Sequence, residues 1–275
     1  MRNQTQIFAN KFDDLETATF DIQDYSKLKF GSNQAARRMG KELALQFFAQ
    51  VAMKHIGEQF VIIPSPYNHV HNAATMMTDH FINYFNMLQS QYNQGRSAEL
   101  DIIHRKVSYI NDYGFLDKAS RKKLIDGDTF YCNKEFWGDK KLVFIDDVNI
   151  TGTHEDKLIE ILDENQVKND VYFLYFAKYE GNQADTEAKL NFNYINTPEA
   201  FVKMINEERD AQCLVRPIKY LMGQNHEDFK IILSQLPHYY VEQLFFGCLA
   251  EGYNRIAKYT ENFEFLDRYT KQHIL

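Results

Sequence analysis

One strand–turn–helix unit constrains the fold of this chain more than any other feature. Residues 141–148 (KLVFIDDV) are mostly apolar and predict a buried strand, which delivers two adjacent acids, Asp146 and Asp147, to its end. A Thr-Gly-Thr turn at 151–153 follows, and the spacing of apolar residues predicts a helix over 154–164. Because a buried strand leading into a helix is typical of a parallel sheet covered on both faces, this unit indicates an α/β fold.

The rest of the chain continues this alternation of helices and strands. Apolar spacing predicts helices over 34–55 and 73–91, and shorter apolar runs predict strands over 60–63, 100–110, 129–132 and 170–177. The polar segment 111–128 is expected to be mobile, and the residues after 198 are typical of helices throughout. We therefore expect a parallel sheet flanked by helices, with an N-terminal helix, over 1–190, and a helical C-terminal appendage over 191–275.

Composition excludes several classes of protein. A net charge of −7 argues against a broad nucleic-acid interface, because such surfaces need an excess of Lys and Arg. No apolar run is long enough to cross a bilayer, and the first residues lack the apolar core of a secretory signal. Three cysteines far apart without a CxxC pair favour buried thiols in a reducing compartment. We expect a cytoplasmic protein whose partner is a small molecule, with no nucleic acid and no membrane.

The acids and the turn after them suit a sugar phosphate. Carboxylates at a strand end, here Asp146 and Asp147, can accept hydrogen bonds from a vicinal diol and can hold a hard cation directly or through water. The hydroxyls of Thr151 and Thr153, with backbone N–H groups and the positive end of the next helix, form a cradle for a phosphate. The alternative is a strand, an acidic turn and a helix without a ligand, with Thr153 as N-cap and Asp156 completing a capping box.

This segment resembles the signature of type I phosphoribosyltransferases. That signature is an apolar strand, two acids, an apolar residue, two variable positions, and then Thr or Ala, Gly and small or hydroxyl residues. The matching residues are Asp146, Asp147, Val148, Thr151, Gly152 and Thr153, while Asn149 and Ile150 occupy the variable positions. His154 stands where the family usually has a small or apolar residue. Over 105–153 the layout of Arg105, Leu116, Arg121, Leu124 and Phe130 is weakly similar to the ComF-like members.

The resemblance implies a site for phosphoribosyl pyrophosphate with magnesium. Asp146 and Asp147 would be the catalytic acids and would hold the metal mostly indirectly. Substrate-binding residues would be Val148, Asn149, Ile150, Thr151, Gly152 and Thr153. Family members contact pyrophosphate through the loop at 65–72, which here lacks glycine, so the side chains of Ser65, Tyr67 and Asn68 are candidates instead. Further candidate pyrophosphate ligands are the cations Arg105, Lys106 and Arg121.

The implied activity is transfer of a 5-phosphoribosyl group to a nitrogen acceptor, and many relatives pair, so a homodimer is compatible with the resemblance. Two other classes stay open at this point. The domain could bind the donor or a nucleotide as a non-catalytic regulator, which the glycine-poor loop favours. It could also be a scaffold, since the aromatic residues of the last 40 positions suit either core packing or a partner surface.

Overall fold

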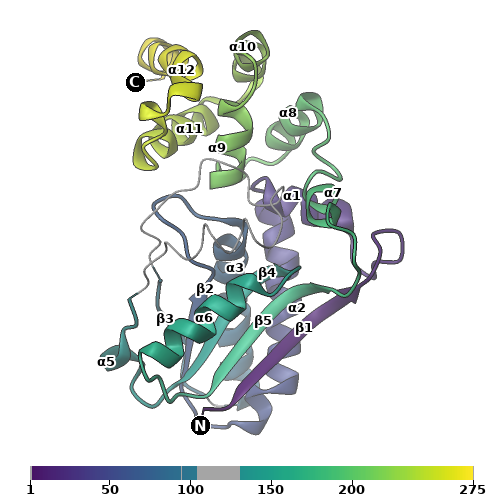
Figure 1. The fold of residues 1–275 in the computed structure, drawn as a ribbon, viewed down its shortest axis with the longest axis vertical. Coiled ribbons are helices and arrows are strands. Elements are labelled where there is room, and N and C mark those ends of the chain that lie inside the picture. Colours follow the sequence, from purple (N-terminus) through teal and green to yellow (C-terminus); the bar gives the residue numbers. More distant parts are fainter. Residues whose placement is uncertain (1, 94, 104–130, 275) are drawn as a thin grey trace.

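The computed structural model describes residues 2–93, 95–103 and 131–274. Its centre is a five-stranded sheet in the order β1-β5-β4-β2-β3, in which every neighbouring pair is parallel. The strands are β1 (Gln4–Phe12), β2 (Phe60–Pro64), β3 (Glu99–Leu100), β4 (Lys141–Asn149) and β5 (Val171–Tyr179). All five run toward the same end of the molecule, where the helices of the C-terminal region gather (Figure 1). The predicted α/β fold is confirmed.

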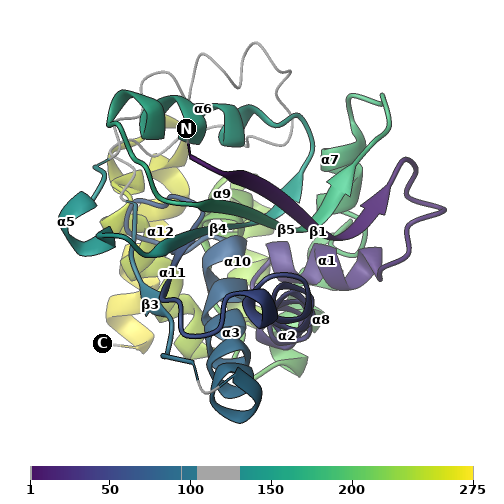
Figure 2. The ribbon, with the colours of Figure 1, turned by 90° about the horizontal axis from the view of Figure 1, so that it is seen from below.

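Helices cover both faces of the sheet, which explains why its central strands are almost wholly apolar. One face carries α1 (Ile22–Lys29), α2 (Asn33–Gln50) and α3 (Ala73–Leu88), and the other carries α6 (Thr153–Glu164) (Figure 2). Side chains alternate between the faces along β4 because successive strand residues point to opposite sides. Val143 and Ile145 therefore join the core under α2 and α3, while Leu142 and Phe144 join the core under α6.

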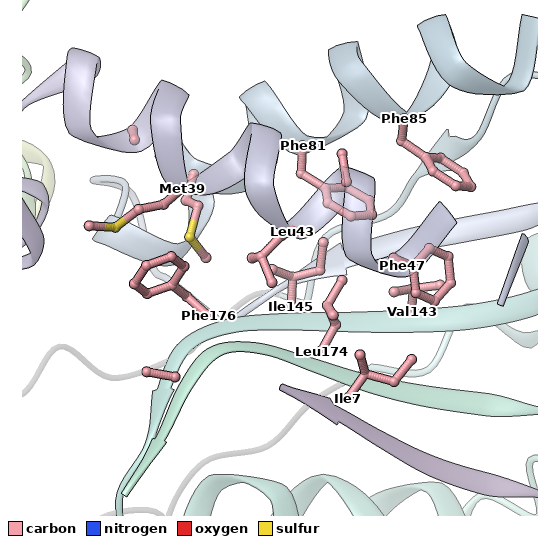
Figure 3. Close-up of a cluster of buried hydrophobic side chains, with 14 of the residues drawn as sticks. Ile7, Met39, Leu43, Phe47, Phe81, Phe85, Val143, Ile145, Leu174 and Phe176 are labelled. Carbon is pink, nitrogen blue, oxygen red and sulfur yellow. The ribbon is translucent and has the colours of Figure 1, made fainter. Parts of the chain in front are cut away.

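The larger core lies between the sheet and the α2–α3 pair. Met39, Leu43 and Phe47 of α2 reach down toward the strands, beside Phe81 and Phe85 of α3 (Figure 3). The rings of Phe47, Phe81 and Phe85 contact one another with centroids 5.5–6.0 Å apart. Such aromatic packing fixes the position of α3, whose N-terminus lies at the carboxyl end of the sheet.

The two helices pack closely at Gly40. A Cβ atom at this position would lie 2.5 Å from the backbone oxygen of Met77 and 2.9 Å from the Cβ of His80. We expect Gly40→Ala to lower the free energy of unfolding by about 1–3 kcal/mol, because α3 must move away to admit the methyl group. Chemical denaturation measures this loss, with exposed Ala49→Ser on the same helix as the control. An unchanged Gly40→Ala midpoint would contradict the close approach.

The C-terminal region is helical, as predicted. Its helices are α7 (Thr186–Asn191), α8 (Pro198–Glu207), α9 (Val215–Met222), α10 (His226–Gln235), α11 (His238–Ala250) and α12 (Thr260–His273), with 3-10 turns at Tyr253–Arg255 and Ala257–Tyr259. Helices α8 to α12 enclose a separate apolar core that includes Tyr240, Tyr253 and Tyr259, all at most 1% exposed, while Leu190 of α7 joins the core of the sheet. The aromatic residues of this region thus serve largely as core. The three cysteines are free and buried.

The structure corrects several predicted elements. The N-terminal residues form the edge strand β1 before the helix α1, and neither element was predicted. The helix predicted over 34–55 ends at Gln50, and the one predicted over 73–91 ends at Leu88, before a π-helical turn at Gln89–Asn93. Of the strand predicted over 100–110, residues 101–103 are not in a strand.

The third predicted strand is also corrected. Residues 131–132 lie outside any strand, and the short helix α5 (Lys134–Trp137) follows them. The remaining parts of these two predictions, 104–110 and 129–130, lie outside the described residues, as does the segment 111–128 that we expected to be mobile.

Candidate functional site

The two acids at the end of β4 have different environments. Asp147 is buried, with a side chain 7% exposed, and forms an ion pair with Lys29 of α1. Its second oxygen accepts from the backbone N–H of Val148 at 2.8 Å. Burial raises the pKa of the Asp147 carboxyl above its ordinary value, and the Lys29 ammonium opposes that rise. Both oxygens of Asp147 are therefore already held by the protein.

Asp146 is the more accessible acid, with a side chain 20% exposed. One oxygen accepts from the backbone N–H of Asp147 at 2.9 Å. The other lies 3.5 Å from Nδ1 of His154, a residue in the first turn of α6. A partly exposed carboxylate can accept hydrogen bonds from a hydroxyl ligand. Of the two acids, Asp146 is better placed to touch a ligand.

The loop from 151 to 153 opens the helix α6 in an unusual way. Gly152 is the N-cap with φ +72, a left-handed conformation that glycine adopts without steric cost, and it offers no side chain to cap the helix. Thr153 is the first helical residue rather than the N-cap, so the capping box of the alternative without a ligand is wrong. The hydroxyls of Thr151 and Thr153 lie 2.8 Å apart. Two adjacent hydroxyls at a helix N-terminus without a capping side chain suit an anion.

A buried glutamate supports this loop from beneath. Glu155 accepts from the Tyr175 hydroxyl at 2.8 Å and from Nδ2 of Asn149 at 3.2 Å, and it also accepts from the Gln6 side chain. Burial raises the pKa of Tyr175 well above its ordinary value, so this hydroxyl remains a donor. The network ties the end of β4 to β5, to β1 and to α6. It therefore fixes the position of the 151–153 loop relative to the strands.

These groups open into a cavity of about 170 Å³, more than ten times the roughly 10–15 Å³ that one water requires on this measure, so it can hold a small ligand. Predicted site residues that line it are Ser65, Asp146, Asp147, Val148, Asn149, Ile150, Thr151 and Gly152. Thr153 is buried beside Thr151. Tyr67 and Asn68 are not among the lining residues: the Tyr67 ring packs on His71, and Asn68 donates to Glu251 of the helical region at 3.2 Å. Arg105, Lys106 and Arg121 lie outside the described residues.

The structure adds lining residues that sequence analysis did not identify. Lys29 comes from α1, Glu187 from α7, and Val215, Arg216 and Lys219 from α9. No local motif marks them, because they reach the cavity through packing of elements far apart in the chain. The only sequence signal is the three-residue spacing of Arg216 and Lys219, which puts both on one face of α9.

A parallel sheet whose central strand carries two acids into a Thr-Gly-Thr turn defines the phosphoribosyltransferase class of α/β proteins. A family model described as PRTase ComF-like matches residues 4–266, and the chain belongs to this family. The match extends well beyond the 105–153 segment that carried the ComF-like resemblance. It includes β1 and most of the C-terminal helices, for which sequence analysis found no relative. No curated protein matches the chain.

Two further observations concern membrane-spanning helices and metal ligands. Within the residues that the structure describes, no helix is long and apolar enough to cross a membrane. The same residues contain no group of three or more His, Cys, Asp or Glu side chains arranged to hold a metal ion.

Proposed function

We propose that this protein binds phosphoribosyl pyrophosphate with magnesium and transfers the 5-phosphoribosyl group to a nitrogen acceptor. One observation carries the proposal: Asp146, Thr151 and Gly152 line the same cavity, a few residues apart in the chain. A ribose 5-phosphate carries a diol and a phosphate on one small molecule, so the two groups could be held in this cavity at once. Family membership supports the same class of reaction.

Each part of the site has a role in this reaction. The hydroxyls of Thr151 and Thr153 and the N-terminal amides of α6 hold the 5′-phosphate, and this remote binding positions the anomeric carbon. Asp146 accepts hydrogen bonds from the ribose hydroxyls. Its negative charge also stabilises the positive charge that develops on the ring as the pyrophosphate bond breaks. Asp147 is held by Lys29 and keeps the end of β4 in place. Its carboxylate also lies at the wall of the cavity.

Magnesium fits this donor set only as an ion that arrives with the substrate. The cavity offers Asp146 as an accessible carboxylate, and Mg²⁺ keeps several waters when it binds proteins. Pyrophosphate oxygens would supply most of the ligands, with Asp146 contacting the ion through water. When bound, the ion would neutralise charge on the departing pyrophosphate.

A second function stays open because of the 65–72 loop. Its backbone N–H groups at His69 and Val70 donate to the carboxylate of Glu251, at 2.9 and 2.7 Å. A loop occupied in this way favours a protein that binds the donor without catalysing transfer. Release of pyrophosphate in the presence of candidate acceptors separates the two functions, since a non-catalytic binder releases none.

Calorimetric titration of phosphoribosyl pyrophosphate tests the proposal. We expect binding with magnesium and at least about tenfold weaker binding when the metal is chelated or when Asp146 is replaced by Asn, because a charged hydrogen bond contributes roughly 1.5–3 kcal/mol. Asp156→Asn, at an exposed position on the neighbouring helix α6, is the control and should bind as the wild type does. Absence of binding by the wild-type protein in both conditions would refute the proposed site.

A further inference from the structure

Two cations of the helical region line the cavity on the side contributed by α9. Arg216 and Lys219 lie three residues apart, on the face of α9 that borders the cavity, while Ile218, Leu221 and Met222 pack in the helical core. Leu214, just before the helix, belongs to the core of the sheet. This placement of α9 is therefore anchored on both sides.

The helix begins directly against the loop that follows β2. The backbone N–H of Val215 donates to the carbonyl oxygen of His71 at 3.1 Å. The 65–72 loop and the N-terminal turn of α9 thus border the same part of the cavity. Ser65 and Asn72, at the two ends of the loop, line it together with Arg216 and Lys219.

The tip of this loop is already engaged by a carboxylate. Glu251, which is 8% exposed, accepts from the N–H groups of both His69 and Val70 through one oxygen, and from the Asn68 side chain through the other. These are the groups through which a loop of this kind would hold an anion. A second anion at the same amides would have to displace a buried carboxylate.

The cations that line the cavity from α9 offer a place for a second anionic group. A donor with a phosphate at one end of the ribose and a pyrophosphate at the other needs two anion sites, and the 151–153 loop supplies one. Among the lining Lys and Arg residues in the described part of the chain, Lys29 of α1 pairs with Asp147, while Arg216 and Lys219 line the side formed by α9. Guanidinium groups bind phosphates through two parallel hydrogen bonds.

Resting on the proposed function, we infer that Arg216 and Lys219 bind the pyrophosphate end of the donor. The C-terminal helices then contribute to the substrate site itself, and the tip of the 65–72 loop, held by Glu251, serves as its support.

Titration of three ligands into an Arg216→Gln/Lys219→Gln variant tests this inference. We expect affinity for phosphoribosyl pyrophosphate and for pyrophosphate to fall by roughly 10- to 100-fold, the range for losing charged hydrogen bonds. Affinity for ribose 5-phosphate, which lacks the pyrophosphate, should stay within about twofold of the wild type. Exposed Lys203→Gln on α8 is the matched control, and thermal denaturation verifies that each variant is folded.

The outcomes separate this inference from the proposed function. If the wild type binds neither phosphoribosyl pyrophosphate nor ribose 5-phosphate, both ideas fail. If it binds both and the double variant binds all three ligands unchanged, or loses ribose 5-phosphate equally, only the role of α9 is refuted. Glu251→Gln gives a second test: a gain in pyrophosphate affinity of about tenfold or more would show that the loop amides are the true site.

Discussion

Lys29→Met should lower the free energy of unfolding by about 3–5 kcal/mol, because it leaves the buried Asp147 carboxylate without its opposite charge. The size of the effect depends on pH. An unfolded aspartate has a pKa of about 4. Below that value Asp147 is protonated and carries no charge for Lys29 to balance. Since burial already raises the folded pKa of Asp147, the deficit should be small in acid and grow as the pH rises through that folded value.

Urea denaturation at several pH values measures this deficit. The double variant Lys29→Met/Asp147→Asn, which removes both charges, should recover most of the lost stability at neutral pH. Lys41→Met, at an exposed position on α2, is the control for loss of a lysine elsewhere. A deficit that is the same at every pH would indicate that Lys29 acts through packing rather than through its charge.

Gly31→Ala should lower the free energy of unfolding by about 2–5 kcal/mol, the combined range for left-handed backbone strain and for overpacking. Gly31 has φ +99, and a Cβ atom there would lie 1.9 Å from the backbone oxygen of Gln212. The carbonyl of Gly31 also accepts from the N–H of Gln212 at 2.9 Å. The added methyl group must push apart the turn after α1 and the segment leading into α9.

Gly57→Ala separates the two causes of this loss. Gly57 has φ +81, but a Cβ atom there would meet nothing within 4 Å, so alanine at this position carries backbone strain without a clash. Thermal denaturation should show a clearly larger loss for Gly31→Ala than for Gly57→Ala. Equal losses would mean that the contact with Gln212 yields without cost.

The sequence was most informative where one segment carries a complete pattern. The strand 141–148 is buried on both faces, so its apolar run is visible without knowledge of its neighbours, and β4 is confirmed over Lys141–Asn149. β5 was predictable for the same reason. The acids and the Thr-Gly-Thr turn lie within a dozen residues, and eight of the predicted site residues line one cavity. Their roles in binding and catalysis remain proposals.

What the sequence could not predict depends on contacts between distant segments. β1 is an edge strand with mostly exposed or half-buried residues, so QTQIFANKF has an apolar run of only three residues, and its pairing with β5 reveals the strand. No pattern in the sequence distinguishes Lys29 from other lysines, because only the packing of α1 buries it against Asp147. Arg216 and Lys219 appear as surface cations of an amphipathic helix, and only the position of α9 directs them to the cavity.

The pairing of β1 with β5 also has a consequence for how this chain folds during synthesis. The hydrogen bond between Asn3 and Asp170 joins residues 167 positions apart. Ribosomes add roughly 5–20 residues per second, so β1 waits on the order of ten seconds for its partner strand to emerge. The entropic cost of closing so long a loop is only slightly larger than for a shorter one, since each doubling of length costs only about 0.6 kcal/mol. The separation of the two strands therefore lengthens the time that folding takes more than it lowers the stability of the folded protein. The polar composition of β1 protects the unpaired strand from aggregation during this delay.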